Sequence, residues 1–505
     1  MIRCLSILCF IQSAFFYSAA QTKSIPDMLE NTLKGIVTVA IYKTDFAKKP
    51  LGFRGAPSDL AYSKVLDLSG AKESGSGFIV EYNNKYYVIT NAHVVENAAS
   101  QDGSIYVYTI SYKKHAAKIV GGDTFYDLAV LEFTEPVPDG EIEALKFKPE
   151  EARLGDQVFA IGNPLGDYPF SVSDGIISAK NRIRGGITGR FGFLQTTATI
   201  IWGNSGGPLV DINGNVAGIN SQIAFADRDN SSIWQPQINF ALEANIAQRL
   251  IHDILDNNGL VKRAYVGVEF AQNEIDPNHP EAAGQIRPGD FPGKFPVINH
   301  IIPKGPADGI LNQYIGARII SVDNEEVRNV QEVLGAFEKI HPGDTVVLKV
   351  SKSEQVNEVK IQSTNSNAQT NAAIAYFMLS NKGCTMQQNN EKVFISFSSE
   401  NAYSSYNDQN DLINLGQKKV MNSQALFQNN WIIAAAGIIS DQTNQIWIVK
   451  DMADLGMVLR LCGTTGISDM ILFKAGADPA NEDNYVRKRF VLSGRNFIYQ
   501  QTLWY

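Results

Sequence analysis

Short apolar and β-branched runs, separated by Gly, Asn and Asp turns, fill residues 26–259. They are SGSGFIV (74–80), KYYVIT (85–90), SIYVYTI (104–110), DLAVLEF (127–133), DQVFAIG (156–162), GNVAGIN (214–220) and INFAL (238–242). Short strands at this spacing are typical of an all-β barrel or sandwich. The apolar spacing of EANIAQRLIHDIL (243–255) predicts a helix that closes this unit.

Two further units follow. The second, from Tyr265 to about Ser363, has strand patterns and a helical pattern in NVQEVLGAFEKI (329–340), and STNSNAQTN (363–371) has the composition of a polar linker. In the third unit ADLGMVLRLCG (453–463) predicts a short helix, so we expect an α+β domain. Its predicted strands are EKVFISFSS (391–399), NWIIAAAGII (430–439), QIWIVKD (445–451), DMILFKA (469–475) and KRFVLS (488–493).

The first 20 residues, MIRCLSILCFIQSAFFYSAA, have the pattern of an export signal. One positive charge at Arg3 precedes an apolar run, and Ser18 and Ala20 offer small residues before a cleavage site. A retained anchor is the alternative, although the run is short for a membrane-spanning helix. After cleavage only Cys384 and Cys462 remain, and export permits a disulfide without proving one.

We therefore expect four segments: a signal peptide (1–20), a protease-like unit (21–259), a second domain (260–363) and a C-terminal domain (364–505). The 505 residues carry a formal net charge of -8 and no long basic run, which argues against nucleic acid or an anionic membrane face as a partner. The sequence has no Cys/His cluster, acidic calcium loop or phosphate-binding glycine loop. We expect no metal and no cofactor.

The segment GNSGGP (203–208) places Ser205 among glycines. A serine nucleophile needs an adjacent base, most often histidine. His93, where the β run KYYVIT gives way to small residues, is the favoured base. His115 stands among lysines and is expected in solvent, His252 falls on the predicted helix, and the other three histidines lie beyond the first unit.

Asp127, at the start of DLAVLEF, is the candidate to orient the base. Taken alone it could equally be a solvated turn residue. The order His93, Asp127, Ser205, with gaps of 34 and 78 residues, fits a two-barrel β protease whose second barrel carries the nucleophile. Gly203, Asn204 and Ser205 would then form the oxyanion hole, mainly through the N–H groups of Gly203 and Ser205.

TNAHVV (90–95), DLAVL (127–131) and GNSGGPLV (203–210) resemble the HtrA (Deg) serine proteases of the chymotrypsin-like class. IPDMLENTLKGIVTVAIYK (25–43), AIGNPLG (160–166) and SVSDGIISA (171–179) extend the resemblance over residues 26–258. It implies a catalytic triad of His93, Asp127 and Ser205. It also implies a cleft with Ser221, Gln222 and Ile223 on the non-prime side and Ile238, Asn239 and Phe240 at the specificity pocket. Ile238 and Phe240 could instead be ordinary core.

The loop TTATIIWGNS (196–205) departs from the family. Thr197 and Ile201 stand where relatives often have Asp and Asn, so a loop that switches between active and inactive shapes is more apolar here. We expect Trp202 to pack against a neighbouring loop and to bias the oxyanion hole toward either the active or the inactive state; the sequence does not tell which of the two.

The second unit resembles the PDZ domain that usually follows this protease, with AYVGVEF (264–270), FPVINHIIPKGPADGI (295–310), GARIISVDNEEV (316–327) and HPGDTVVLKVSK (341–352) in order. The resemblance implies that Tyr265, Val266, Gly267 and Val268 form a loop for a peptide carboxylate. Residues 271–294 are an insertion, and Ala317 replaces the usual Asp. The third unit could be a divergent second PDZ domain, and Trp431, Trp447 and Trp504 could be core or a binding surface.

The resemblance implies an exported, ATP-independent serine endopeptidase that cleaves unfolded or misfolded envelope proteins. The implied partners are such polypeptides and C-terminal peptides, the implied assembly is a homotrimer or larger, and the implied compartment is the periplasm, with secretion as the alternative. Two other functions stay open: a peptide-binding, chaperone-like scaffold with a latent protease, and a processing protease with one partner.

Overall fold

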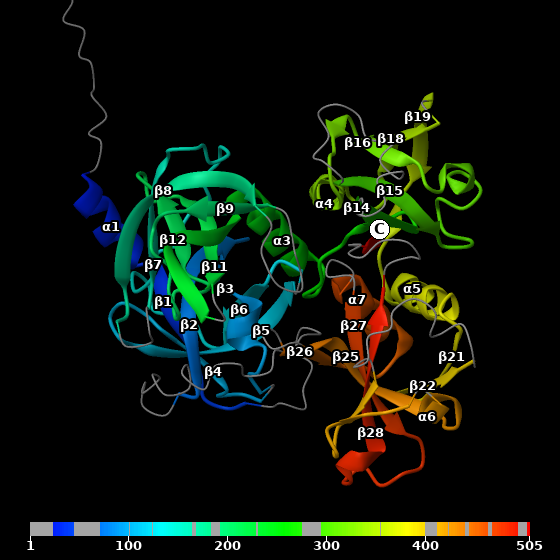
Figure 1. Ribbon diagram of the computed structural model, residues 1–505. Helices are drawn as coiled ribbons and strands as arrows, with labels where there is room; N and C mark the ends of the chain where they lie inside the picture. Colours follow the sequence, from blue (N-terminus) through cyan, green and yellow to red (C-terminus); the bar gives the residue numbers. More distant parts are fainter. Residues whose placement is uncertain are drawn as a thin grey trace, which may run out of the picture.

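The computed structural model describes residues 24–44, 71–99, 101–123, 125–163, 168–182, 192–228, 231–274, 294–353, 355–398, 412–422, 424–439, 444–462, 467–492 and 502–504. The fold is mainly β and has three units (Figure 1). Two barrels lie on one side, and two sheets with their helices lie on the other. Within the described residues no helix is both long and apolar enough to span a bilayer.

The first unit consists of two closed six-stranded barrels, as the sequence predicts. The first barrel has the order β1 (Ile36–Ile41), β2 (Glu73–Tyr82), β3 (Lys85–Thr90), β6 (Leu128–Phe133), β5 (Lys114–Asp123) and β4 (Ile105–Tyr108). The second has the order β10 (Pro208–Asp211), β11 (Val216–Arg228), β12 (Ser231–Glu243), β9 (Phe193–Thr196), β8 (Ser171–Arg182) and β7 (Gln157–Gly162). All seven strand runs predicted in this unit lie in these barrels.

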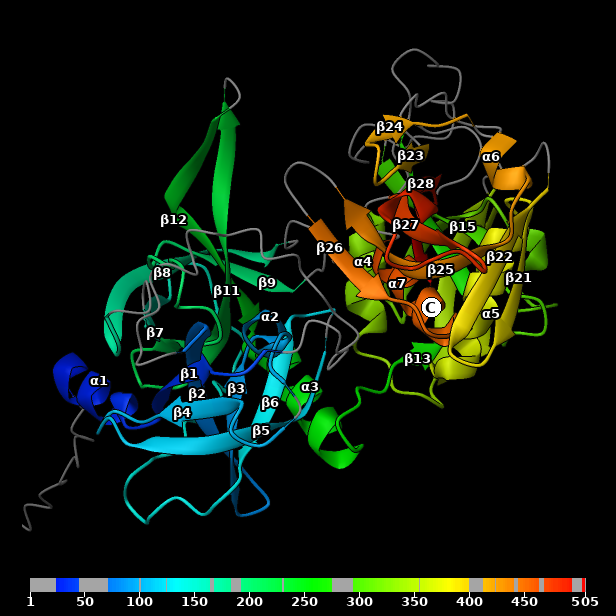
Figure 2. The ribbon, with the colours of Figure 1, turned by 90° about the horizontal axis from the view of Figure 1, so that it is seen from below.

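Each barrel has a hydrophobic core of its own, and strands such as β1 and β10 are buried at every position, because their other faces pack in a larger cluster. Helix α1 (Ile25–Leu33) precedes the first barrel, the one-turn helix α2 (Ala92–Val95) follows β3, and α3 (Ala244–Asp256) closes the unit at the predicted place. The β11–β12 hairpin extends well beyond its barrel (Figure 2).

The second unit is built on a sheet in which α4 covers the buried face. The sheet order is β19 (Gln355–Gln362), β18 (Thr345–Lys352), β16 (Arg318–Val322), β15 (Lys294–Ile301), β14 (Val268–Glu274) and β29 (Thr502–Trp504), with β17 (Glu325–Glu326) beside β16. Helix α4 (Val330–Phe337) begins at the Asn329 cap, as the pattern predicts, and η4 (Asn312–Tyr314) follows β15. The strand β29 comes from the far end of the chain.

The third unit is an α+β domain, and every strand and helix predicted for it is present. Its sheet order is β21 (Cys384–Asn389), β22 (Lys392–Phe397), β25 (Trp431–Ile439), β27 (Ile467–Lys474), β28 (Tyr485–Val491), β23 (Leu412–Asn414) and β24 (Lys419–Val420), with β26 (Asn444–Ile448) beside β25. Its helices are α5 (Ala368–Ser380), α6 (Gln424–Phe427), α7 (Met452–Cys462) and η7 (Glu482–Asn484). Trp431 and Trp447 are buried, so they are core residues and not a binding surface. The Trp504 side chain lies outside the described residues.

The segment 363–371 is exposed for most of its length, but it forms regular structure and is not the irregular linker that its composition predicts. Thr364 and Asn365 form β20, which pairs with β13 (Ala264–Tyr265), and the N–H of Ser366 donates to the Arg263 carbonyl at 2.9 Å. Asn367 then caps α5 in a reciprocal capping box with Thr370. A polar composition gives no sign of a pairing partner 100 residues away, which is why the sequence misleads here.

A buried ion network joins the first two units. The Arg263 guanidinium, which precedes β13, donates to both carboxylate oxygens of Asp123 at 2.8 and 3.0 Å and to Glu338 at 2.8 Å. Glu338 ends α4 and also accepts from Arg249 of α3 at 2.6 Å. The side chains of Arg263, Asp123 and Glu338 are all less than a tenth exposed.

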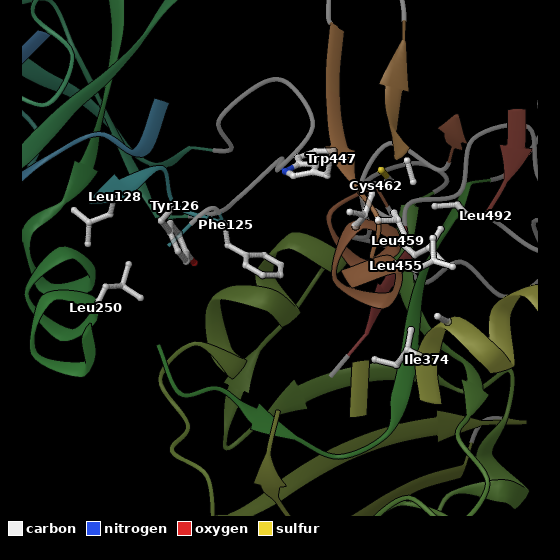
Figure 3. Close-up of a cluster of buried hydrophobic side chains, with 14 of the residues drawn as sticks. Phe125, Tyr126, Leu128, Leu250, Ile374, Trp447, Leu455, Leu459, Cys462 and Leu492 are labelled. Atoms are coloured by element: carbon white, nitrogen blue, oxygen red, sulfur yellow. The ribbon is translucent and has the colours of Figure 1, made fainter. Parts of the chain in front are cut away.

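A continuous hydrophobic cluster joins the first unit to the third. Figure 3 shows Phe125 between Tyr126 and Leu128 of the first barrel and the side chains of α7 and β26. The Arg263 guanidinium lies 4.6 Å from the Phe125 ring centre, and that of Arg460 lies 5.7 Å from it. The three units therefore meet around one aromatic ring.

We expect Arg263→Ala to lower the free energy of unfolding by about 3–5 kcal/mol, because it leaves Asp123 buried without its cation and Glu338 with Arg249 as its remaining cation. Urea unfolding measures this loss. Arg153→Ala is the matched control, because the Arg153 side chain is 84% exposed, and it should change stability by less than about 1 kcal/mol. Equal effects of the two substitutions would contradict a structural role for the network.

Cys384 and Cys462 are both free thiols in the structure, so the disulfide that export permits does not form in this fold. Burial raises the pKa of each thiol to about 12. We expect neither to react with Ellman's reagent in the native protein at pH 8, because the thiolate is the reactive form. Both should react after denaturation, and rapid reaction of the native protein would contradict their burial.

Candidate active site

His93 and Asp127 lie in direct contact on neighbouring elements of the first barrel. His93 sits on α2, just after β3, and Asp127 immediately precedes β6. His93 Nδ1 is 2.8 Å from Asp127 Oδ2, and the His93 N–H donates to Oδ1 at 2.9 Å. The Asp127 side chain is 4% exposed and that of His93 is 35% exposed, so the ring keeps an open side.

The backbone carbonyl of Asp127 also accepts hydrogen bonds from the residues that precede His93. Its carbonyl accepts from the Ala92 N–H at 3.1 Å and from Asn91 Nδ2 at 2.8 Å. Asp127 therefore accepts hydrogen bonds from three successive residues, Asn91, Ala92 and His93. It also adopts φ = +59°, which is uncommon for a residue other than glycine. The turn before it is held by Asp123, which accepts the Tyr126 N–H at 3.0 Å.

Ser221 faces Asp127, a role that the sequence did not reveal. The β11–β12 register shifts between Asn220 and Gln222, which marks a bulge at Ser221. The Ser221 hydroxyl is 3.5 Å from Asp127 Oδ2, and the residue is buried. The Ser221 side chain is therefore directed at the Asp127 carboxylate, so a contact of Ser221 with substrate in the cleft would come from its backbone.

Ser205 lies on a tight loop before β10 whose shape depends on glycines. The Asn204 N–H donates to the Ile201 carbonyl at 3.0 Å, and Gly203 has φ = +95° at the third position of that turn. A positive φ there is the mark of a type II turn. Gly206 has φ = +84°, and its N–H donates to the Asn220 carbonyl at 2.9 Å.

Two N–H groups of this loop have no acceptor among the residues that the structure describes. Asn204, Gly206 and Gly207 each donate to a backbone carbonyl. In the part of the chain that the structure describes, the N–H groups of Gly203 and Ser205 donate to none. These are the two groups for which the sequence predicts an oxyanion site.

Ser76, in the middle of β2, connects the first barrel to the nucleophile loop. Its N–H donates to the Ser205 carbonyl at 2.9 Å, and its hydroxyl donates to the Gly203 carbonyl at 2.6 Å. The hydroxyl also accepts the Asn163 N–H at 2.7 Å. Both loop carbonyls are thus held toward Ser76.

Close backbone contacts bring α2 and this loop together. A Cβ added to Gly75 would lie 2.6 Å from Val94 and 3.3 Å from the Ser205 carbonyl. A Cβ added to Gly206 would lie 2.3 Å from the Ser76 carbonyl and 2.8 Å from the Asn91 nitrogen. The residues flanking His93 and the backbone of the nucleophile loop therefore converge on the same short stretch of β2.

A second carboxylate, Glu73, lies near the base. Burial raises the pKa of Glu73, and the hydrogen bond from Asn97 and the nearby His93 oppose that rise only in part. The described residues contain no group of three His, Cys, Asp or Glu side chains able to hold a metal ion. A cavity of about 710 Å³ lies between the first and second units, lined by Glu243, Arg249 and Glu338 among others, and not by the proposed triad.

The residues expected at the specificity pocket have different environments. Ile238 is 37% exposed and Phe240 is half-buried, so Ile238 is not core. Asn239 is fully buried and donates to the carbonyls of Ala198 and Pro236 at 3.0 and 2.8 Å. Gln222 and Ile223 pair with Phe240 and Asn239 across β11 and β12, and their side chains lie outside the described residues.

Trp202 is covered only in part. Ile200 is buried and Ile201 is half-buried, whereas Trp202 is 43% exposed. Its packing against a neighbouring loop stays a prediction. His115, expected in solvent, is only 17% exposed and lies 2.7 Å from Glu141. His252 is on α3, as predicted.

In the second unit, residues 265–268 form a loop with a similar arrangement of backbone groups. The carbonyls of Val266 and Gly267 accept from Ala307 and Ile302 at 2.9 and 2.8 Å, and Gly267 has φ = +75°. Among the described residues their own N–H groups have no acceptor. Burial raises the pKa of Tyr265 to about 12, so its phenol is neutral. Val268 begins β14 and is buried.

Comparison with known proteins agrees with this geometry. A family described as "Trypsin-like peptidase domain" matches residues 75–219. Serine endoprotease DegS of Escherichia coli (strain K12) is 35% identical over 288 residues, which cover 56% of this chain and 74% of DegS. Serine protease Do-like HtrA of Bacillus subtilis (strain 168) is 30% identical over 359 residues, covering 68% of this chain and 74% of that protein.

One further relative and one solved structure are similar. A probable periplasmic serine endoprotease DegP-like of Chlamydia trachomatis is 33% identical over 318 residues, covering 62% of this chain and 58% of that protein. The structure of an HtrA-type protease AlgW with tripeptide superposes with a TM-score of 0.50 at 25% identity. It covers 68% of this chain and 98% of that one.

We expect Ser76→Ala to lower kcat by about 10- to 100-fold, or about 1.4–2.8 kcal/mol in activation free energy, because the Gly203 carbonyl loses its donor and the loop its orientation. Steady-state hydrolysis of a short peptide substrate measures this, with the melting temperature as a check on folding. Ser178→Ala is the matched control, since Ser178 donates to the Gln195 carbonyl elsewhere on the second barrel. Equal kcat values for both variants would refute the positioning role of Ser76.

Proposed function

Since this chain belongs to the HtrA (Deg) family of serine endopeptidases, we propose that it cleaves unfolded or misfolded proteins with a triad of His93, Asp127 and Ser205. The observation that carries the proposal is the 2.8 Å contact between His93 and Asp127, beside a loop whose Gly203 and Ser205 N–H groups find no acceptor within the described ranges and could receive a ligand. Neither feature alone would suffice, because ion pairs and glycine turns are common.

The contacts assign a role to each group of the proposed triad. Asp127 engages His93 Nδ1, so Nε2 is the nitrogen available to take the Ser205 hydroxyl proton. The serine oxygen then attacks the scissile carbonyl, and Nε2 returns the proton to the leaving amine. This leaves an acyl-enzyme, which water hydrolyses by the same proton route in reverse.

The oxyanion of each tetrahedral intermediate would lie between the N–H groups of Gly203 and Ser205, with Asn204 connecting them. One such donor contributes about 100- to 1000-fold in rate. The positive φ of Gly203 and the bonds from Ser76 hold the loop in a shape in which neither donor has an acceptor among the described residues. This arrangement supports a competent protease over a latent one.

Substrate would lie along the β11–β12 hairpin. Ser221, Gln222 and Ile223 would flank its non-prime side, while Ile238 and Phe240 would line the pocket and Asn239 would brace it from beneath. Exposed aliphatic Ile238 favours small or medium aliphatic residues before the cut. A single apolar contact discriminates by only about 1–3 kcal/mol, so many sequences should be cleaved.

The second unit would act as a PDZ domain for C-terminal peptides. The carbonyls of Val266 and Gly267 are held by the protein and the N–H groups are available, as a carboxylate-binding loop from Tyr265 to Val268 requires. The named relatives include a periplasmic endoprotease, which supports an exported protein of the periplasm. We extend the proposal to a homotrimer or larger assembly on the strength of the family alone.

We expect Ser205→Ala and His93→Ala each to lower casein cleavage by several orders of magnitude, with little further loss in the double variant, because triad members act as a unit. Fluorophosphonate labelling of wild-type Ser205, followed by mass spectrometry, tests the nucleophile directly.

A single variant that kept about a tenth of the activity would rule out the triad. A wild-type protein that folds but neither labels nor cleaves would favour the latent scaffold, and one discrete product from casein would favour a processing protease.

A further inference from the structure

The chain's own C-terminal segment forms the outermost strand of the second unit. Thr502, Leu503 and Trp504 make up β29, which pairs antiparallel with β14 opposite Ala271, Phe270 and Glu269. In Figure 1 the C-terminal end lies between the β14–β15 sheet above and α5 and α7 below. Without β29, β14 would be the open edge of this sheet.

The direction of β29 leads toward the loop at residues 265–268. Thr502 is opposite Ala271 and Trp504 is opposite Glu269, so each step along β29 approaches the turn at Gly267. That turn carries the two N–H groups for which no acceptor exists among the described residues. An extended peptide that adds a strand to β14 in this direction would make the same approach.

The β29 pairing is short compared with the pairing on the other side of β14. β14 pairs with β15 at seven positions but with β29 at only three. The segment TLW is uncharged and contains residues that favour strands. A three-residue strand contributes few ladder hydrogen bonds, so its hold on β14 depends mainly on being tethered to the same chain. A tether of this kind supplies an effective concentration of about 1 mM.

We propose that residues 502–504 of this chain occupy the β14 edge in cis, and that an extended, uncharged, apolar-aromatic peptide must displace this segment to bind there. The segment lies between two units, because both α4 and α7 contact β29. Displacement would therefore change the contact between the second and third units as well as the occupancy of the edge. The inference rests on the peptide-binding role proposed above for the second unit and is independent of Ser205 chemistry.

The test measures binding of a fluorescein-labelled peptide with the sequence of residues 495–505, RNFIYQQTLWY, by anisotropy. All proteins carry Ser205→Ala, so that cleavage plays no part, and Cys4→Ser and Cys9→Ser. One protein has the full chain and one ends at Ser493. A third carries Ala271→Cys and Thr502→Cys, which are directly opposite in the register and can form a disulfide that locks β29 in place.

We expect the truncated protein to bind the peptide at least about tenfold more tightly than the full chain, because it has no tethered competitor. The oxidised locked variant should bind none, and its reduction should restore the affinity of the full chain. The buried thiols of Cys384 and Cys462 do not interfere. A peptide with the same residues in scrambled order is the matched control and should bind weakly to every protein.

Three outcomes would overturn the inference. Equal affinity of the full, truncated and locked proteins would show that the peptide binds elsewhere. Absence of binding to the truncated and the reduced proteins would show that the β14 edge accepts no peptide in trans. Failure of the two introduced cysteines to form a disulfide would contradict the Ala271–Thr502 pairing. If the truncated protein does not fold, the comparison of oxidised and reduced locked protein still decides between these cases.

Discussion

A positively charged guanidinium buried at the meeting point of three units is the constraint on which the architecture depends. A charge in such a place is stable only when counter-charges surround it in good geometry. Arg263 meets this requirement with Asp123 of the first barrel and Glu338 of the second unit, and its face lies against Phe125. Neither unit can move away without leaving a charge unpaired in a dry environment. The relative position of the units is therefore fixed by electrostatics as well as by apolar contact.

The second constraint is the close approach of the two barrels at Ser76. The nucleophile loop has glycines where side chains would collide with β2, and the carbonyls of Gly203 and Ser205 point back to one serine. The N–H groups of these two residues have no acceptor in the described part of the chain. The proposed oxyanion site would thus be a consequence of how the carbonyl side of the loop is bound.

The sequence predicted the two barrels, because strand periodicity is a local signal, and its contiguous motifs selected His93, Asp127 and Ser205 as candidates. It could not reveal Ser76 or the contact of Ser221 with Asp127, since a hydroxyl shows no sign of a partner about 90 residues or more away. The order of segment 363–371 and the pairing of β29 were missed for the same reason. The His115–Glu141 contact was misjudged because composition alone cannot give the direction of a side chain. The triad itself, as a working unit, remains a proposal that the geometry supports.

The turn from Asp123 to Asp127 has a consequence for how this protein can evolve. Asp123 pairs with the Arg263 guanidinium, and Asp127, four residues later, binds His93. We therefore expect a substitution at position 263 that moves Asp123 to alter both the docking of the second unit and the position of His93. We expect the short connection between α3 and β13 to tolerate less change than its surface loops, even though it bears no chemistry of its own.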